Sequence, residues 1–234
     1  MKLSDFSDNL QKSLGDNLRS IVLYGSAVGK DFSEKFSDYN LILILNDTNL
    51  KKISPASSLI EKWCKGKNPP PLIFDSNHIN TSLDVFPLEF LDIKRRHETL
   101  YGEDPFKDIA IDRKNLRHQC ESELKGKLIH LRSFYATHSK SSKELENILL
   151  SSFTTFMAIM RGILQLLGIE PAQSNEEVVD QLADKISFDR EIFKTISAAR
   201  MKKNKLPKDE MNKFFTEYLT QIEKITNYVD KFNT

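Results

Sequence analysis

Hydrophobic and polar residues follow two different patterns along the chain, and the change falls near residue 112. Before it, short apolar runs separated by glycine, proline and polar turns predict strands between helices. After it, apolar residues recur at helical spacing and glycines are few. We therefore expect an α+β domain with a small mixed sheet flanked by helices over residues 1–112. An all-α helical bundle should follow over residues 113–234.

The first part begins with a helix and two strands. Apolar residues at helical spacing predict an amphipathic helix over 3–14, and two apolar runs predict strands over 19–24 and 39–45. The second run is almost entirely apolar, as expected of a strand covered on both faces. The pattern then predicts a helix over 57–65, a strand over 72–74, a polar connection over 77–82, a strand over 83–86 and a turn over 102–105.

Several helices are expected in the second part. One apolar stripe runs from Cys120 to Tyr135, and a strongly apolar helix covers 145–167. Ser174 and Glu177 form a capping box before the next apolar positions. Two more helices are expected over 188–201 and from about residue 207 to 232.

Composition and charge fit an ordinary cytoplasmic protein. Residues 1–112 carry 14 Lys and Arg against 17 Asp and Glu, and residues 113–234 carry 20 against 16. An acidic half can hold a divalent cation and a basic half can face phosphate, but solvated surfaces explain so small a difference more simply. No apolar segment reaches the roughly 18 residues of a membrane span, so no membrane partner is expected. Cys64 and Cys120 lie too far apart to suggest a disulfide framework or a zinc site.

Candidate chemistry begins where the first strand ends. Gly25 and Ser26 follow the apolar run directly, and the short helix expected after them offers free amides to an anion. The segment from Gly25 to Asp31 is similar to a P-loop, but it is one residue short and ends in Asp where Ser or Thr binds Mg²⁺. Lys30 is still a candidate for contact with a phosphate, and a solvated loop lysine is the simpler alternative.

Acidic and amide side chains follow at the second strand. Asp38 and Asn40 are two positions apart, so on a strand they point to the same face and could share a cation. Asp84 lies in the expected strand over 83–86 and could supply a further carboxylate. Asp75 competes for that role, but its polar neighbours indicate a turn.

In this order, the candidate residues resemble the nucleotidyltransferase superfold, which includes DNA polymerase beta, poly(A) polymerases and aminoglycoside nucleotidyltransferases. The family pattern is a Gly-Ser turn, an Asp-x-Asp pair about a dozen residues later, and a lone Asp on a later strand. The resemblance implies that Gly25 and Ser26 hold the phosphates of a nucleoside triphosphate. It also implies that Asp38, Asn40 and Asp84 hold Mg²⁺ or Mn²⁺. Asp38 and Asp84 would then be the catalytic residues, and Asp84 would favour the attacking hydroxyl.

The resemblance covers residues 18–104 and extends to the helical half in architecture only. It implies transfer of a nucleoside monophosphate from a metal-bound triphosphate to a hydroxyl of a small molecule, RNA or protein. Asn40 departs from the family, which has its second Asp there, so the site is either weakened or inactive. An inactive relative would bind a nucleotide or a partner protein. A toxin–antitoxin component is a third hypothesis, because Arg132 and His138 are similar to the Arg-x-His pairs of helical RNases. The acceptor, the preferred nucleotide and the oligomeric state, including a homodimer, stay open.

Overall fold

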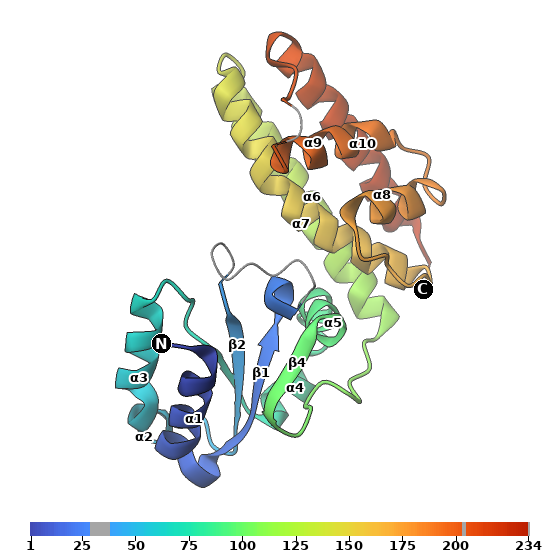
Figure 1. Cartoon of the computed structure of the whole chain (residues 1–234). Coiled ribbons are helices and arrows are strands. Elements are labelled where there is room, and N and C mark those ends of the chain that lie inside the picture. Colours follow the sequence, from blue (N-terminus) through green and yellow to red (C-terminus); the bar gives the residue numbers. More distant parts are fainter. Residues whose placement is uncertain (29–37, 203–204, 234) are drawn as a thin grey trace. The chain divides into compact units, whose positions relative to one another are not determined.

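The computed structural model describes residues 1–28, 38–202 and 205–233 (Figure 1). Contacts within the chain divide it into two units, Met1–Ile111 and Asp112–Thr234. This division lies one residue from the one expected from the sequence. The first unit contains a 4-stranded mixed sheet with helices, and the described part of the second unit contains helices only. The expected α+β class with an appended helical part is therefore confirmed.

The first unit alternates short helices with the strands of the sheet. Its elements are α1 (Leu3–Leu14), η1 (Gly15–Asn17), β1 (Leu18–Tyr24), η2 (Gly25–Val28), β2 (Asn40–Leu45), α2 (Leu50–Ile53), η3 (Ser54–Ala56), α3 (Ser57–Lys65), β3 (Leu72–Phe74), α4 (Ser76–Ser82), α5 (Pro87–Arg95) and β4 (His97–Gly102). In the sheet the strand order is β3-β2-β1-β4. Strand β1 is antiparallel to β2 and β4, whereas β3 is parallel to β2.

Helices cover both faces of this sheet, α1 and α3 on one side and α4 and α5 on the other (Figure 1). On the first side Phe6 of α1 stacks on Trp63 of α3, with ring centroids 4.3 Å apart, above alternate residues of β1 and β2. On the second side Phe90 of α5 packs against the β1 and β2 residues whose side chains point to that face, such as Val22 and Ile42. Because both faces of the two central strands are buried, their sequences are almost continuously apolar.

Two sequence predictions for residues 77–86 are wrong. The polar connection over 77–82 is helix α4, and the strand over 83–86 is a turn that leads into α5. A strand over these residues would be expected to bury its apolar positions, but Val85 is 56% exposed. Pro87 instead opens α5, since proline is well tolerated in the first turn of a helix.

The second unit is a helical bundle. Its elements are α6 (Arg113–His138), α7 (Ser142–Leu166), α8 (Asn175–Ala183), α9 (Arg190–Arg200), η4 (Lys208–Glu210) and α10 (Met211–Lys231). The N-cap half of the predicted capping box is confirmed, because the Ser174 hydroxyl accepts the Glu177 N–H at 3.2 Å. The Glu177 carboxylate accepts the Ser174 hydroxyl at 2.8 Å.

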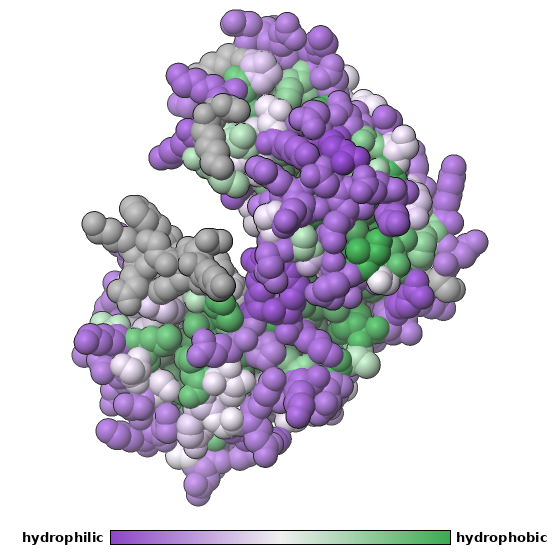
Figure 2. All heavy atoms as spheres, turned by 45° about the vertical axis from the view of Figure 1, so that its right-hand side comes forward, coloured by the Kyte–Doolittle hydropathy of each residue, from purple (hydrophilic) through white to green (hydrophobic). Residues whose placement is uncertain are grey.

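Helix α7 lies at the centre of the bundle. It packs against α6, α8, α9 and α10, and its buried residues include Phe153, Phe156 and Ile163. By length and composition alone α7 could cross a membrane, which corrects the expectation that no segment passes this test. Half of the 18-residue apolar stretch of α7 is buried inside the bundle, as expected of a core helix. On the face shown in Figure 2, hydrophilic residues cover most of the surface and hydrophobic ones lie in smaller groups among them.

Candidate functional site

The glycine turn at the end of β1 is held by the residue that joins α5 to β4. Gly25 has a φ of +78°, a conformation that favours glycine, and it opens the 3-10 helix η2. The Gly25 N–H donates to the Arg96 carbonyl oxygen at 2.9 Å. Phosphate contacts at this turn would therefore have to come from the amides that follow Gly25 along η2.

Asn40 lies beside this turn. It pairs with Tyr24 in the β1–β2 register, and a Cβ atom at Gly25 would lie 3.5 Å from Asn40 Nδ2. Asn40 is half-buried, while Asp38 precedes the strand and is exposed. The structure thus brings Gly25 and Asn40 together, as the sequence predicts. Lys30 lies outside the described residues.

The strand next to Asn40 carries no acidic residue. Strand β3 is in parallel register with β2, Ile42 opposite Leu72 and Ile44 opposite Phe74. Since alternate residues share a face, these side chains lie on the Asn40 face of the sheet. The family pattern has a lone Asp on a strand after the Asp-x-Asp pair, and here the next strand reads Leu-Ile-Phe.

Asp75, the competing acid, is a helix cap. One of its carboxylate oxygens accepts the His78 N–H at 2.7 Å and the other accepts the Thr48 hydroxyl at 3.1 Å. The bond from the His78 backbone is the main cause of a lowered pKa at Asp75, despite the opposing effect of desolvation. Asp75 also follows the end of β3 opposite to Asn40, which removes it from the candidate site.

Asp84 lies in the turn between α4 and α5 rather than on a strand, and its side chain is exposed. It makes no hydrogen bond or ion pair within the described ranges. The described residues also contain no group of three His, Cys, Asp or Glu side chains placed to hold a metal ion. The role of Asp84 as a metal ligand with Asp38 and Asn40 stays a prediction. These three residues supply two carboxylates and one amide, so they do not fit a three-carboxylate metal site.

The start of β4 adds residues that the sequence patterns did not single out. His97 pairs with Tyr24 in the β1–β4 register, and His97 Nε2 lies 3.0 Å from Asp104 Oδ1. Burial opposes ionisation of Asp104, but bonds from the Phe106 N–H and from His97 outweigh it and hold its pKa below the usual range. Burial raises the pKa of the Tyr24 hydroxyl, so it stays protonated at neutral pH. The nonlocal pairing of β4 with β1 has no signal in the sequence.

The residues that suggested an RNase have structural partners in the bundle. Arg132 Nη2 is 2.7 Å from Glu223 Oε1 on α10. The His138 ring stacks on Phe134 with centroids 4.2 Å apart, and its Nδ1 lies 3.1 Å from the Phe134 carbonyl oxygen. These contacts do not bring Arg132 and His138 together as a pair.

Comparison with known proteins supports the fold. No protein family and no curated protein matches the sequence. Among solved structures, the chain is similar to the spectinomycin adenyltransferase AAD(9) from Enterococcus faecialis, solved with ATP and spectinomycin. The similarity has a TM-score of 0.56 at 11% identity and covers 94% of this chain and 98% of that chain. The chain therefore has a nucleotidyltransferase-like fold that includes the helical unit.

Proposed function

We propose that this protein binds a nucleoside triphosphate at the turn after β1 without a three-carboxylate metal site. Two observations carry the proposal: the family pattern has its second Asp where this chain has Asn40 at the start of β2, and β3, which pairs with β2 from Ile42 to Ile44, contains no acid. The similarity to a structure solved with ATP supports the choice of ligand. The protein would then be a nucleotide-binding module built on a transferase fold.

Asn40 suits such a site because its side-chain amide is neutral and can donate a hydrogen bond to a phosphate oxygen. A carboxylate at the same position would repel the phosphates unless a cation lay between them. Two unit charges about 4 Å apart interact by about 4 kcal/mol at an effective dielectric constant of 20. Replacing the acid by Asn removes a repulsion of this order, so binding should not require Mg²⁺.

Isothermal titration of the full chain with ATP, GTP, CTP and UTP, each with Mg²⁺ and with EDTA, tests this function. We expect at least one nucleotide to bind with similar affinity in both conditions. Asn40→Asp should weaken binding in EDTA and restore part of it with Mg²⁺. Asn227→Asp, at an exposed position of α10, is the matched control for the added charge. Absence of binding by all four nucleotides would refute the proposal.

A second candidate function is the transfer itself. The similarity to AAD(9) spans both units of this chain, and that protein was solved with both ATP and spectinomycin. On this reading the chain would transfer a nucleoside monophosphate to a hydroxyl of a small molecule, RNA or protein, using Mg²⁺ or Mn²⁺ held by Asp38, Asn40 and Asp84. Pyrophosphate release measured with the wild type and with Asn40→Asp separates the two functions. If only Asn40→Asp releases pyrophosphate in the presence of metal, the wild-type site has lost its activity. If the wild type releases pyrophosphate and Asn40→Asp releases less, Asn40 belongs to a working site.

A further inference from the structure

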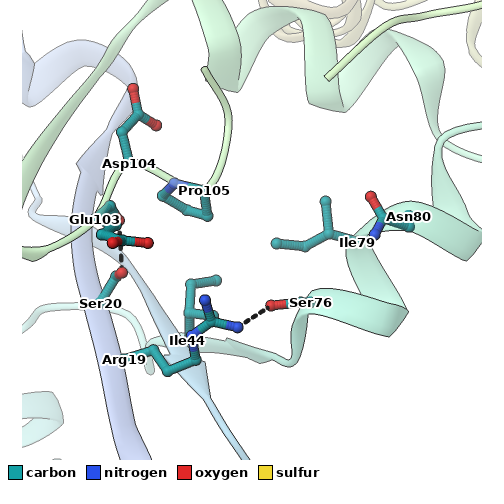
Figure 3. A pocket seen from close by; sticks show the side chains of 9 residues that line it. All are labelled: Arg19, Ser20, Ile44, Ser76, Ile79, Asn80, Glu103, Asp104 and Pro105. Carbon is teal, nitrogen blue, oxygen red and sulfur yellow. Dashed lines mark hydrogen bonds between the residues drawn. The ribbon is translucent and has the colours of Figure 1, made fainter. Parts of the chain in front are cut away.

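The first unit contains a polar pocket at the end of the sheet opposite the Gly25 turn. Its volume is about 160 Å³, and it is lined by Arg19, Ser20, Ile44, Ser76, Ile79, Asn80, Glu103, Asp104 and Pro105 (Figure 3). In the β1–β2 register, Ser20 pairs with Ile44 and Tyr24 pairs with Asn40. Four residues of strand separate the two ends, about 13 Å at roughly 3.3 Å per residue. The pocket is therefore separate from the candidate nucleotide site.

The walls of this pocket are built from fixed elements. Ile44 and Ile79 are 1% and 2% exposed, so the apolar surface belongs to the buried core. The Ser20 hydroxyl, itself buried, donates to the Glu103 carbonyl oxygen at 2.6 Å and ties the segment after β4 to β1. Asp104 in the same segment accepts the Phe106 N–H at 2.8 Å. The segment of Glu103 and Asp104, which lines one wall, is thus fixed by a hydrogen bond to β1 and by one to Phe106.

Arg19 and Glu103, which carry opposite charges, both line the pocket and do not pair with one another. Arg19 Nη1 donates to the Ser76 hydroxyl at 2.8 Å, which aims the guanidinium along the α4 side (Figure 3). The Glu103 side chain has no hydrogen bond or ion pair in the part of the chain that the structure describes, and neither has the Asn80 amide. Arg19 and Glu103 are both exposed, so a guanidinium and a carboxylate are accessible to a ligand, and half-buried Pro105 supplies apolar surface in the same pocket.

We infer that this pocket binds a free α-amino acid with a small apolar side chain. The ligand carboxylate would pair with the Arg19 guanidinium, whose fork of donors matches a carboxylate, and the ammonium would pair with Glu103. The ligand side chain would lie against Pro105, above the buried Ile44 and Ile79. Asp104, which also lines the pocket, is already engaged by His97 and by the Phe106 N–H. An anion alone would be repelled by Glu103 and Asp104 and a cation alone by Arg19, so the charges favour a molecule that carries both.

The size of the pocket agrees with this class of ligand. A cavity of about 150 Å³ accommodates benzene, whereas sites for drug-sized ligands occupy about 300–1,000 Å³. A volume of about 160 Å³ is too small for a nucleotide and suits a molecule with the bulk of valine. The inference does not depend on the proposed nucleotide function, because the two ligands differ and their sites lie at opposite ends of the sheet.

Titration of the full chain with L-valine, followed by calorimetry and by the shift in melting temperature, tests the inference. Isobutylamine and isovalerate are the matched probes, since each has the valine side chain but only one of its charges. We expect valine to bind and each single-charge analogue to bind at least about tenfold more weakly, because one charge-assisted interaction is missing. This comparison uses the wild-type protein and does not depend on any variant. Glycine and L-leucine, as smaller and larger ligands, then test the size limit.

Arg19→Gln and Glu103→Gln should each weaken valine binding at least about tenfold and leave any ATP binding unchanged. Lys52→Gln and Glu61→Gln change the same charges at exposed positions of α2 and α3 and should bind valine like the wild type. The inference is overturned if no amino acid binds, if the single-charge analogues bind as well as valine, or if the pocket variants bind valine normally.

Discussion

Two glycines of the first unit share a backbone conformation but differ in their surroundings, so the same substitution should affect them differently. Gly25 and Gly102 have φ values of +78° and +76°. A Cβ atom at Gly25 would meet Asn40 Nδ2 at 3.5 Å, an ordinary contact. At Gly102 it would lie 1.9 Å from the Arg19 carbonyl oxygen, where β4 pairs with β1. Alanine fits the first position and overlaps backbone at the second.

The magnitudes follow from these distances. An L-residue in the left-handed conformation costs about 1–2 kcal/mol, so Gly25→Ala should lower the free energy of unfolding by that amount at most. Part of this loss is offset because alanine restricts the unfolded chain, an effect of about 0.4–1 kcal/mol. Gly102→Ala has the same conformational cost and must also push β4 away from β1. We expect its total loss to reach about 4 kcal/mol, the upper range for single substitutions.

Urea unfolding followed by tryptophan fluorescence measures the difference in free energy of unfolding between the two variants. The signal reports on the first unit, which contains both glycines. Trp63 is the one tryptophan of the chain and is buried in the first unit. With a urea slope of about 1–3 kcal/mol per molar, Gly25→Ala should move the midpoint by at most about 2 M and Gly102→Ala by about twice as much as Gly25→Ala. Equal midpoints for the two variants, or a wild-type midpoint for Gly102→Ala, would show that the close approach of β4 to β1 is wrong.

Three further substitutions or reagents test other parts of the structure. Asp75→Asn should weaken the cap of α4. Because the pKa of Asp75 is lower in the folded protein, this carboxylate stabilises the fold fully above its unfolded pKa and progressively less as pH falls through its folded pKa. The urea midpoints of wild type and variant should therefore converge below about pH 4. Burial raises the pKa of Cys120 to about 12, so a thiol reagent should modify Cys64 in the native protein and reach Cys120 only after unfolding, as timed by absorbance. Phe6→Ala removes the ring stacked on Trp63 and should cost about 3–5 kcal/mol in the same urea assay; a cost below 1 kcal/mol would contradict the core described for α1 and α3.

The candidate nucleotide site could be predicted in part. Gly25 and Asn40 were found from the order of a glycine turn and a polar pair between two apolar strands, and the structure places them together. The short, mostly apolar run from Leu83 to Phe86 predicts a strand that holds Asp84, but so short a run fits a turn between helices equally well. Only the structure shows that Leu83 to Phe86 form no strand and that the apolar β3 is the strand that pairs with the far side of β2.

Local signals determined much of the architecture from the sequence. The long helices of the second unit, the capping box at Ser174 and the buried strands β1 and β2 all arise from contacts between neighbouring residues or from continuous burial. Such patterns repeat over many positions, so a single exception does not hide them.

Long-range pairing decided what the sequence could not. Strand β4 is a partly exposed edge strand, so its residues lack the apolar run that marked β1 and β2. Its pairing with β1 brings Glu103 to the pocket that also holds Arg19, two residues 84 positions apart. Nothing in either segment alone signals the other, because the favourable free energy of that contact comes from the sheet register and from the core beneath it.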